Sequence, residues 1–170
     1  SMRKGWNGNF EAGYGNDDHY RAKGMANRFK NKMNLSINGT ANDNGINSNQ
    51  RIGANYSQNT QKLKYGGSIE VRENKRDSWS KRHTESFLSD NTSQFSLQNN
   101  QSDGKTSAIS ANFRFEWKLD SLTTIMYRPT FNFSKGNSNS GNFSETLNNE
   151  STPINRKEAT NHQTNDRFST

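Results

Sequence analysis

Apolar and polar residues alternate regularly in the second half of the chain. From Ile109 to Trp117 every second residue is apolar, and the residues between them are polar. A second alternating stretch follows, from Ile125 to Phe133. Because side chains on a strand point alternately to opposite faces, each stretch predicts a strand with one apolar and one polar face.

The two strands fit together as a hairpin. Pairing of Trp117 with Ile125 keeps both apolar rows on one face, and it requires a loop with an odd number of residues, most simply 120–122. Asp120 and Ser121 have the chemistry of turn residues. The sequence therefore predicts one specific register for this hairpin.

That register carries two further predictions. It places Phe113 opposite Pro129, and because proline has no amide hydrogen, Pro129 predicts a bulge or an unpaired position in its strand. It also places Glu116 diagonal to Arg128, close enough for a cross-strand ion pair.

Weaker alternation recurs along the rest of the chain. The predicted strands span residues 5–15, 19–29, 33–42, 50–58, 63–73, 107–119 and 123–134. A change of phase at Arg28 predicts a bulge there. Two polar segments with little periodicity, 74–106 and 135–165, predict long loops, and an eighth strand would fall near residues 160–170. The predicted fold class is all-β, an antiparallel up-and-down meander of about seven or eight strands.

The predicted connections differ in length at the two ends of this meander. Those at 31–32, 59–62 and 120–122 are short and lie at one end, whereas the two longest lie at the other. The polar sequence at 15–18 predicts a further turn at the long-loop end. Bacterial outer-membrane barrels show the same asymmetry between short periplasmic turns and long extracellular loops.

Composition is unusual for a soluble globular domain. Only 26% of the 170 residues are hydrophobic, against roughly 45–50% in typical globular proteins, and the mean hydropathy is −1.25. Such values favour disorder, but the 11% aromatic content and the strict alternation argue against it. The chain contains no cysteine, which excludes disulfides and thiolate metal sites.

The chain is basic, with a formal net charge of +7 and a pI of about 9.7. The cations are scattered along the sequence, which favours a solvated surface over a nucleic-acid interface. Aromatic residues alternating with arginine would also suit a platform for stacking bases. A basic nucleic-acid-binding sheet therefore ranks third, behind the two hypotheses given below.

Residues for catalysis are not apparent. His19, His83 and His162 stand in unrelated contexts, with no spacing that would gather a metal ion. We therefore predict no catalytic, cofactor-binding or metal-binding residues, no cofactor and no enzyme activity.

Three short motifs in order resemble a known family. They are Gly5 to Gly15, Asn-Gly-Thr-Ala-Asn-Asp-Asn at 38–44, and Asn-Phe-Arg-Phe-Glu-Trp-Lys-Leu-Asp-Ser-Leu at 112–122. They are similar to the barrel of the Bacteroidetes TonB-dependent-receptor-like outer membrane protein beta-barrel family, over residues 4–133. The resemblance implies a segment of an outer-membrane barrel, without a plug domain, that contributes wall strands and extracellular substrate-facing loops.

The implied location is the cell outer membrane. The implied partners are outer-membrane lipid, the rest of the barrel and the plug domain of a parent protein, and TonB through that parent. An isolated fragment would have two open sheet edges, so we expect it to self-associate. Nucleic acid is not an expected partner.

In a membrane barrel each strand face has its own environment. The predicted lipid-facing residues are Ile109, Phe113, Phe115, Trp117, Ile125, Tyr127, Phe131 and Phe133. The predicted lumen-facing residues are Arg114, Glu116 and Arg128. Interfacial girdles would contain Trp6, Tyr14, Tyr56, Tyr65, Trp117 and Tyr127.

The alternative is a soluble or surface-attached all-β binding module, such as an adhesin or a glycan-binding domain, whose apolar face packs inward. Glycines and alanines on the apolar face favour lipid, because lipid tolerates gaps that a packed core does not.

Overall fold

The computed structural model describes residues 4–16, 19–88 and 92–170, and all of its regular structure is β-strand. The strands are β1 (Lys4–Tyr14), β2 (Tyr20–Lys30), β3 (Met33–Asp43), β4 (Asn47–Asn59), β5 (Leu63–Phe87), β6 (Ser93–Lys118), β7 (Thr124–Tyr127), β8 (Thr130–Leu147) and β9 (Pro153–Ser169). Asp17 and Asp18, in the predicted turn at 15–18, lie outside the described residues.

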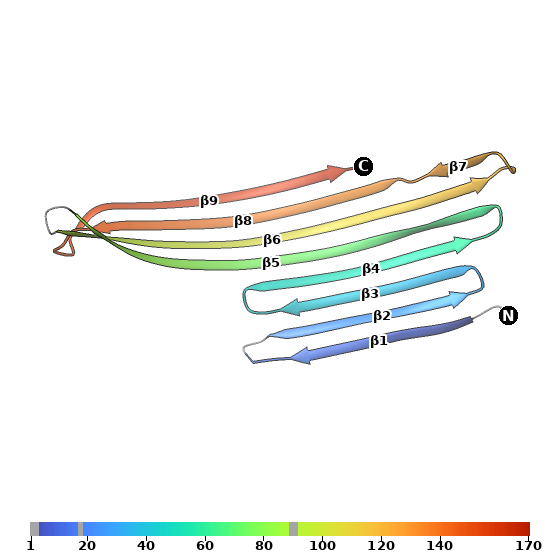
Figure 1. The fold of residues 1–170 in the computed structure, drawn as a ribbon, viewed down its shortest axis with the longest axis horizontal. Helices are drawn as coiled ribbons and strands as arrows, with labels where there is room; N and C mark the ends of the chain where they lie inside the picture. The colour runs from blue at the N-terminus through green and yellow to red at the C-terminus, as the bar shows by residue number, and fades with distance from the viewer. Residues whose placement is uncertain (1–3, 17–18, 89–91) are drawn as a thin grey trace.

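The strands form one open antiparallel sheet in the order β1-β2-β3-β4-β5-β6-β8-β9, with β7 also paired to β6 (Figure 1). Each strand pairs with the next one along the chain, except that β7 and β8 both pair with β6, and this confirms the predicted all-β antiparallel meander. Over the described residues the sheet has nine strands, in place of the expected seven or eight. The predicted strand at 123–134 corresponds to β7 and the start of β8, which follow each other along the same edge of β6.

The hairpin register is as predicted. Trp117 pairs with Ile125, and Ile109 pairs with Phe133. The break between β7 and β8 falls at Arg128 and Pro129, which confirms that Pro129 interrupts its strand. Its carbonyl still accepts a hydrogen bond of 3.0 Å from the amide of Phe113, so the register continues through the break.

The expected loop at 120–122 is also present. It is closed by a 3.0 Å hydrogen bond that the amide of Leu119 donates to the carbonyl of Thr123. With the turns at 31–32 and 60–62, it lies at one end of the sheet, here called the tight-turn end.

The predicted long loop at 74–106 is wrong. Strands β5 and β6 continue as one paired ladder, from Asn74 opposite Thr106 out to Phe87 opposite Ser93. Side chains here are mostly polar on both faces, so hydrophobic alternation disappears although backbone pairing persists. The segment is therefore a projecting hairpin.

The predicted long loop at 135–165 is wrong for the same reason. Strand β8 runs on to Leu147 and β9 begins at Pro153, with a register shift at Thr146 and Leu147. The expected eighth strand near 160–170 is the second half of β9.

The predicted bulge at Arg28 is also wrong, since β2 pairs without a shift with both β1 and β3. Arg28 takes the place of an apolar residue on its face of β2. Its guanidinium lies 5.1 Å from the centre of the Trp6 ring. This cation–π contact explains how the apolar face accommodates an arginine without a change of register.

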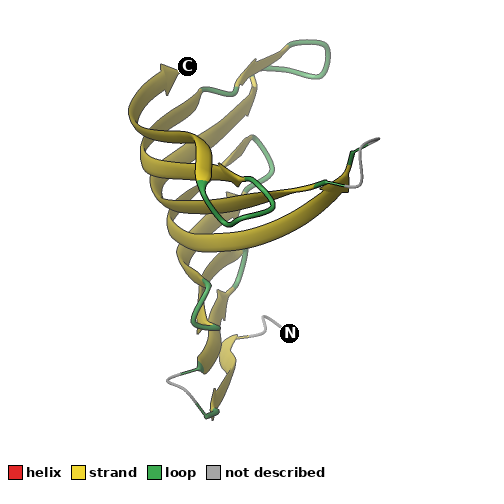
Figure 2. Cartoon of the chain, turned by 90° about the vertical axis from the view of Figure 1, so that its left-hand side faces the viewer, coloured by secondary structure: helices red, strands yellow, loops and turns green. Residues whose placement is uncertain are grey.

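The sheet forms a single curved layer (Figure 2). Within the part of the chain that the structure describes, no second layer covers either face and no side chain is fully buried. The buried residues are Gly53, Ala108 and Glu116, all on the same, polar face. Side chains on a concave surface converge and shield one another, so this pattern indicates that the polar face is the inner one.

Candidate functional site: the two faces of the sheet

Cross-strand pairing joins apolar and small side chains into rows that cross the sheet. One row contains Phe10, Gly24, Gly39, Ile52, Val71, Ile109, Phe133 and Phe168. The next contains Gly8, Ala26, Ile37, Ala54, Ile69, Ala111 and Phe131. We call these rows, and those between them and the tight-turn end, the apolar band.

All eight residues predicted to face lipid belong to the apolar band. Their relative exposure ranges from 38% at Phe115 to 65% at Tyr127. The pairing thus brings them together on one face, and that face is uncovered in the structure.

The apolar band has a defined height. It extends from Leu63 to Val71 on β5 and from Ile109 to Trp117 on β6, nine residues on each strand. At about 3.3 Å per residue this is roughly 26 Å along the strand, and a tilted transmembrane strand needs about 9–11 residues. Beyond Val71 the same face becomes polar, beginning with Glu73 opposite Ser107.

Aromatic residues gather at one boundary of the apolar band. Trp6, Tyr56, Tyr65, Trp117 and Tyr127 all lie toward the tight-turn end, and the Tyr56 and Tyr65 rings are 6.0 Å apart. Tyr14, the remaining residue of the predicted girdles, lies at the opposite boundary, where it pairs with Tyr20.

On the polar face Glu116 is held by two cations. The Lys64 ammonium lies 3.0 Å and the Arg114 guanidinium 2.8 Å from its carboxylate, whose side chain is only 8% exposed. The expected ion pair with Arg128 is therefore wrong, because Lys64 on β5 occupies that role from the other side of β6. Arg114 and Glu116 lie on the face of the sheet that does not carry the apolar band. Arg128 lies in the break between β7 and β8.

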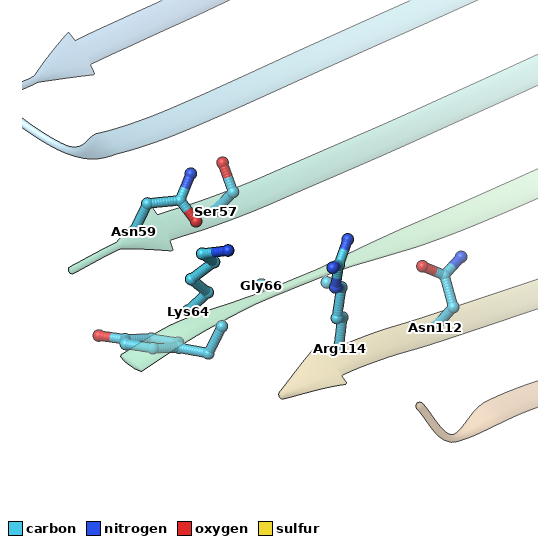
Figure 3. A pocket seen from close by; sticks show the side chains of 8 residues that line it. Ser57, Asn59, Lys64, Gly66, Asn112 and Arg114 are labelled. Atoms are coloured by element: carbon cyan, nitrogen blue, oxygen red, sulfur yellow. The ribbon is translucent and has the colours of Figure 1, made fainter. Parts of the chain in front are cut away.

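A shallow cavity of about 460 Å³ adjoins this cluster. Figure 3 shows Ser57, Asn59, Lys64, Asn112 and Arg114 around it. Gly66 forms its floor, where an added Cβ would lie 2.5 Å from the carbonyl oxygen of Tyr56. The cavity offers hydroxyl, amide and cationic groups, which suit binding of polar groups.

Charge is unevenly distributed over the polar face. Lys23, Arg51 and Arg72 lie in one row across β2, β4 and β5, and Arg51 forms an ion pair with Glu70. In contrast, every polar-face residue from Gln94 to Asn112 on β6 and from Thr130 to Thr146 on β8 is uncharged.

The three histidines lie apart. The rings of His83 and Phe95 stack at 5.9 Å, while His162 contacts Asn139 and Thr164. Within residues 4–16, 19–88 and 92–170, no group of three or more histidine and carboxylate side chains could hold a metal ion.

A basic cluster beside Trp6 was missed by sequence reasoning. Lys4, Arg28 and Lys30 line a cavity of about 290 Å³ together with Gly5, Trp6 and Phe29. The signal becomes visible only with the register of β1 and β2, which places Lys4 opposite Lys30.

Comparison with known proteins gives no further assignment. The sequence matches no protein-family model, and searches of curated proteins and of solved structures return no significant match. The described residues contain no helix of the length and apolarity needed to cross a membrane.

Proposed function

We propose that this chain forms part of the wall of an outer-membrane β-barrel, of the receptor or transporter type that its motifs resemble. In this proposal the apolar band faces lipid and the polar face lines the lumen. The observation that carries it is an apolar band about one membrane high that crosses a sheet with no second layer.

Exposure of such a face to water is unfavourable. Soluble monomers rarely expose apolar patches larger than a few hundred Å². Each large side chain of the band gains on the order of 1 kcal/mol when its exposed half leaves water. Lipid provides this gain without requiring a matched packing surface, which suits a face that contains Gly24, Gly39 and Ala54.

The polar face and the projecting strands fit the same proposal. Membrane barrels have polar interiors and long extracellular loops, and here β5–β6 and β8–β9 extend well beyond the band (Figure 1). The outer edges of β1 and β9 require neighbouring strands, because unpaired backbone groups are costly in lipid. By resemblance, the rest of a parent barrel would supply them, with a plug domain and TonB as its further partners and the cell outer membrane as its location.

Tryptophan quenching tests the proposal directly. Trp117 lies in the apolar band, while Trp79 lies on the same face of β5 beyond it and is 75% exposed. Two full-length variants would each keep one of these residues and carry phenylalanine at the other two tryptophans. After reconstitution in phosphatidylcholine with brominated acyl chains, we expect strong quenching of Trp117 and little quenching of Trp79.

Equal quenching of the two variants would contradict the proposal. So would a chain that is folded and monomeric in buffer without detergent or lipid, a result that would support the soluble or surface-attached binding module.

A further inference from the structure

Three cations surround Trp6 at the tight-turn boundary of the apolar band. Lys4 pairs with Lys30, and Trp6 pairs with Arg28, so all four side chains belong to the face that carries the band. The 290 Å³ cavity lies among them. Trp6, one of the girdle aromatics, is among its lining residues, so the cavity adjoins the tight-turn boundary of the apolar band.

This cluster lacks an anion. Like charges placed directly opposite on neighbouring strands are destabilising, and Lys4 faces Lys30. None of the ion pairs found in the described part of the chain includes Lys4, Arg28 or Lys30. The arrangement therefore favours an anionic ligand in the cavity.

The surrounding rim is also basic. Lys32, Lys62 and Lys118 lie in or beside the adjoining turns and are exposed. Two carboxylates are described at this end. Glu116 is already paired with Lys64 and Arg114, and Asp120 accepts hydrogen bonds from two backbone amides. Positive charge at this boundary is thus largely uncompensated.

We propose that this cavity binds the phosphate group of an anionic phospholipid, with Lys4, Arg28 and Lys30 as its ligands. The inference rests on the proposed membrane function. A phosphate in the cavity would lie level with Trp6 and the other girdle aromatics, where head groups meet acyl chains. The acyl chains of the same lipid would lie along the apolar band, which favours a lipid over a free phosphate.

Lipid binding measured through the fluorescence of Trp6 tests the proposal. The full chain would carry Trp79→Phe and Trp117→Phe, so that only Trp6 reports, in micelles of a zwitterionic detergent. Brominated phosphatidylglycerol and brominated phosphatidylcholine would be titrated separately. We expect phosphatidylglycerol to bind more tightly, by about fivefold for each contributing cation and so roughly a hundredfold for three.

Charge removal provides the matched comparison. The double variant Lys4→Gln with Lys30→Gln keeps the contact of Arg28 with Trp6. We expect its preference for phosphatidylglycerol over phosphatidylcholine to fall about twentyfold. A control with Lys75→Gln and Lys135→Gln removes the same charge from the same face beyond the band, and it should retain the preference.

Each other outcome overturns the proposal. Equal binding of the two lipids, or equal losses in variant and control, would exclude a phosphate site at this cavity. Displacement of phosphatidylglycerol by millimolar inorganic phosphate would show a site for soluble anions. Quenching of Trp117 by brominated phosphatidylcholine tests the membrane proposal separately, so the two can fail independently.

Discussion

Asp120 stabilises the turn between β6 and β7 through one carboxylate oxygen. Its Oδ1 accepts hydrogen bonds of 2.8 Å from the amide of Leu122 and 2.7 Å from the amide of Thr123. These two donors lower the pKa of the Asp120 carboxyl below its usual value. The same residue that suggested a turn in the sequence therefore makes the hydrogen bonds that hold it.

The turn should be sensitive to acid. A lowered folded-state pKa means that Asp120 contributes stability above its unfolded-state pKa of about 3.9, and that this is lost as pH falls through the folded-state value. Asp120→Asn keeps an acceptor oxygen but cannot titrate. We expect its unfolding free energy in detergent to decline less steeply below pH 4 than that of the unmodified chain, and parallel declines would contradict the prediction.

Gly66 is required by a close approach of two backbones. A methyl group at this position would lie 2.5 Å from the Tyr56 carbonyl oxygen and 3.0 Å from the Cα of Ser57. Gly66→Ala should therefore destabilise the sheet by about 1–3 kcal/mol in denaturant titrations.

The control for this substitution is Gly141→Ala on β8. An added Cβ there meets no atom within 4 Å, so its effect should be neutral or slightly stabilising. A similar loss in both variants would show that space at Gly66 is not the cause.

At the scale of the element, alternation predicts strands only where the two faces differ in polarity. The hairpin of β6 and β7 was predicted in register and turn because Phe113, Phe115 and Trp117 contrast with the residues between them. Residues 74–106 lack that contrast, so their pairing was not visible in the sequence. Because residues 74–106 were predicted to be a loop, the register of the pairing between β5 and β6 was not predicted either. Lys64 reaches Glu116 across that pairing, so the true partner of Glu116 was missed.

An engineered disulfide can test the projecting hairpin. Ser78 pairs with Ser102 in the structure, and the chain has no cysteine of its own. Paired residues on antiparallel strands have Cα atoms about 4.5–5.5 Å apart, within the range that a disulfide spans. We expect Ser78→Cys with Ser102→Cys to cross-link under mild oxidation.

The matched pair is Ser78→Cys with Asp103→Cys. Asp103 pairs with Asp77 and points to the other face, so this pair should stay reduced. Cross-linking of both pairs to the same extent would indicate a flexible loop.

At the scale of the whole molecule, the surroundings of the apolar band determine how substitutions act. Ile69 lies in the row next to the middle of the band, which falls at Gly67, and it is half-exposed. In a bilayer, Ile69→Lys should cost about 2–4 kcal/mol, as expected for a cation near the midplane. The measurement is reversible unfolding from phosphatidylcholine vesicles.

Trp79→Lys is the comparison for this prediction. The same face at Trp79 lies beyond the band, so a lysine there should cost less than about 1 kcal/mol. Equal costs at the two positions would argue against a lipid environment for the band.

The arrangement of charge on the polar face has a consequence for small ions. A solute moving along β8, and along β6 between Gln94 and Asn112, passes polar-face amides and hydroxyls but no fixed charge on these stretches. It can be hydrated there without being strongly attracted or repelled. A solute moving along β2, β4 and β5 passes Lys23, Arg51 and Arg72 in a single row. The electric field above the polar face is therefore uneven, and it is stronger above the row of Lys23, Arg51 and Arg72 than above the uncharged stretches of β6 and β8.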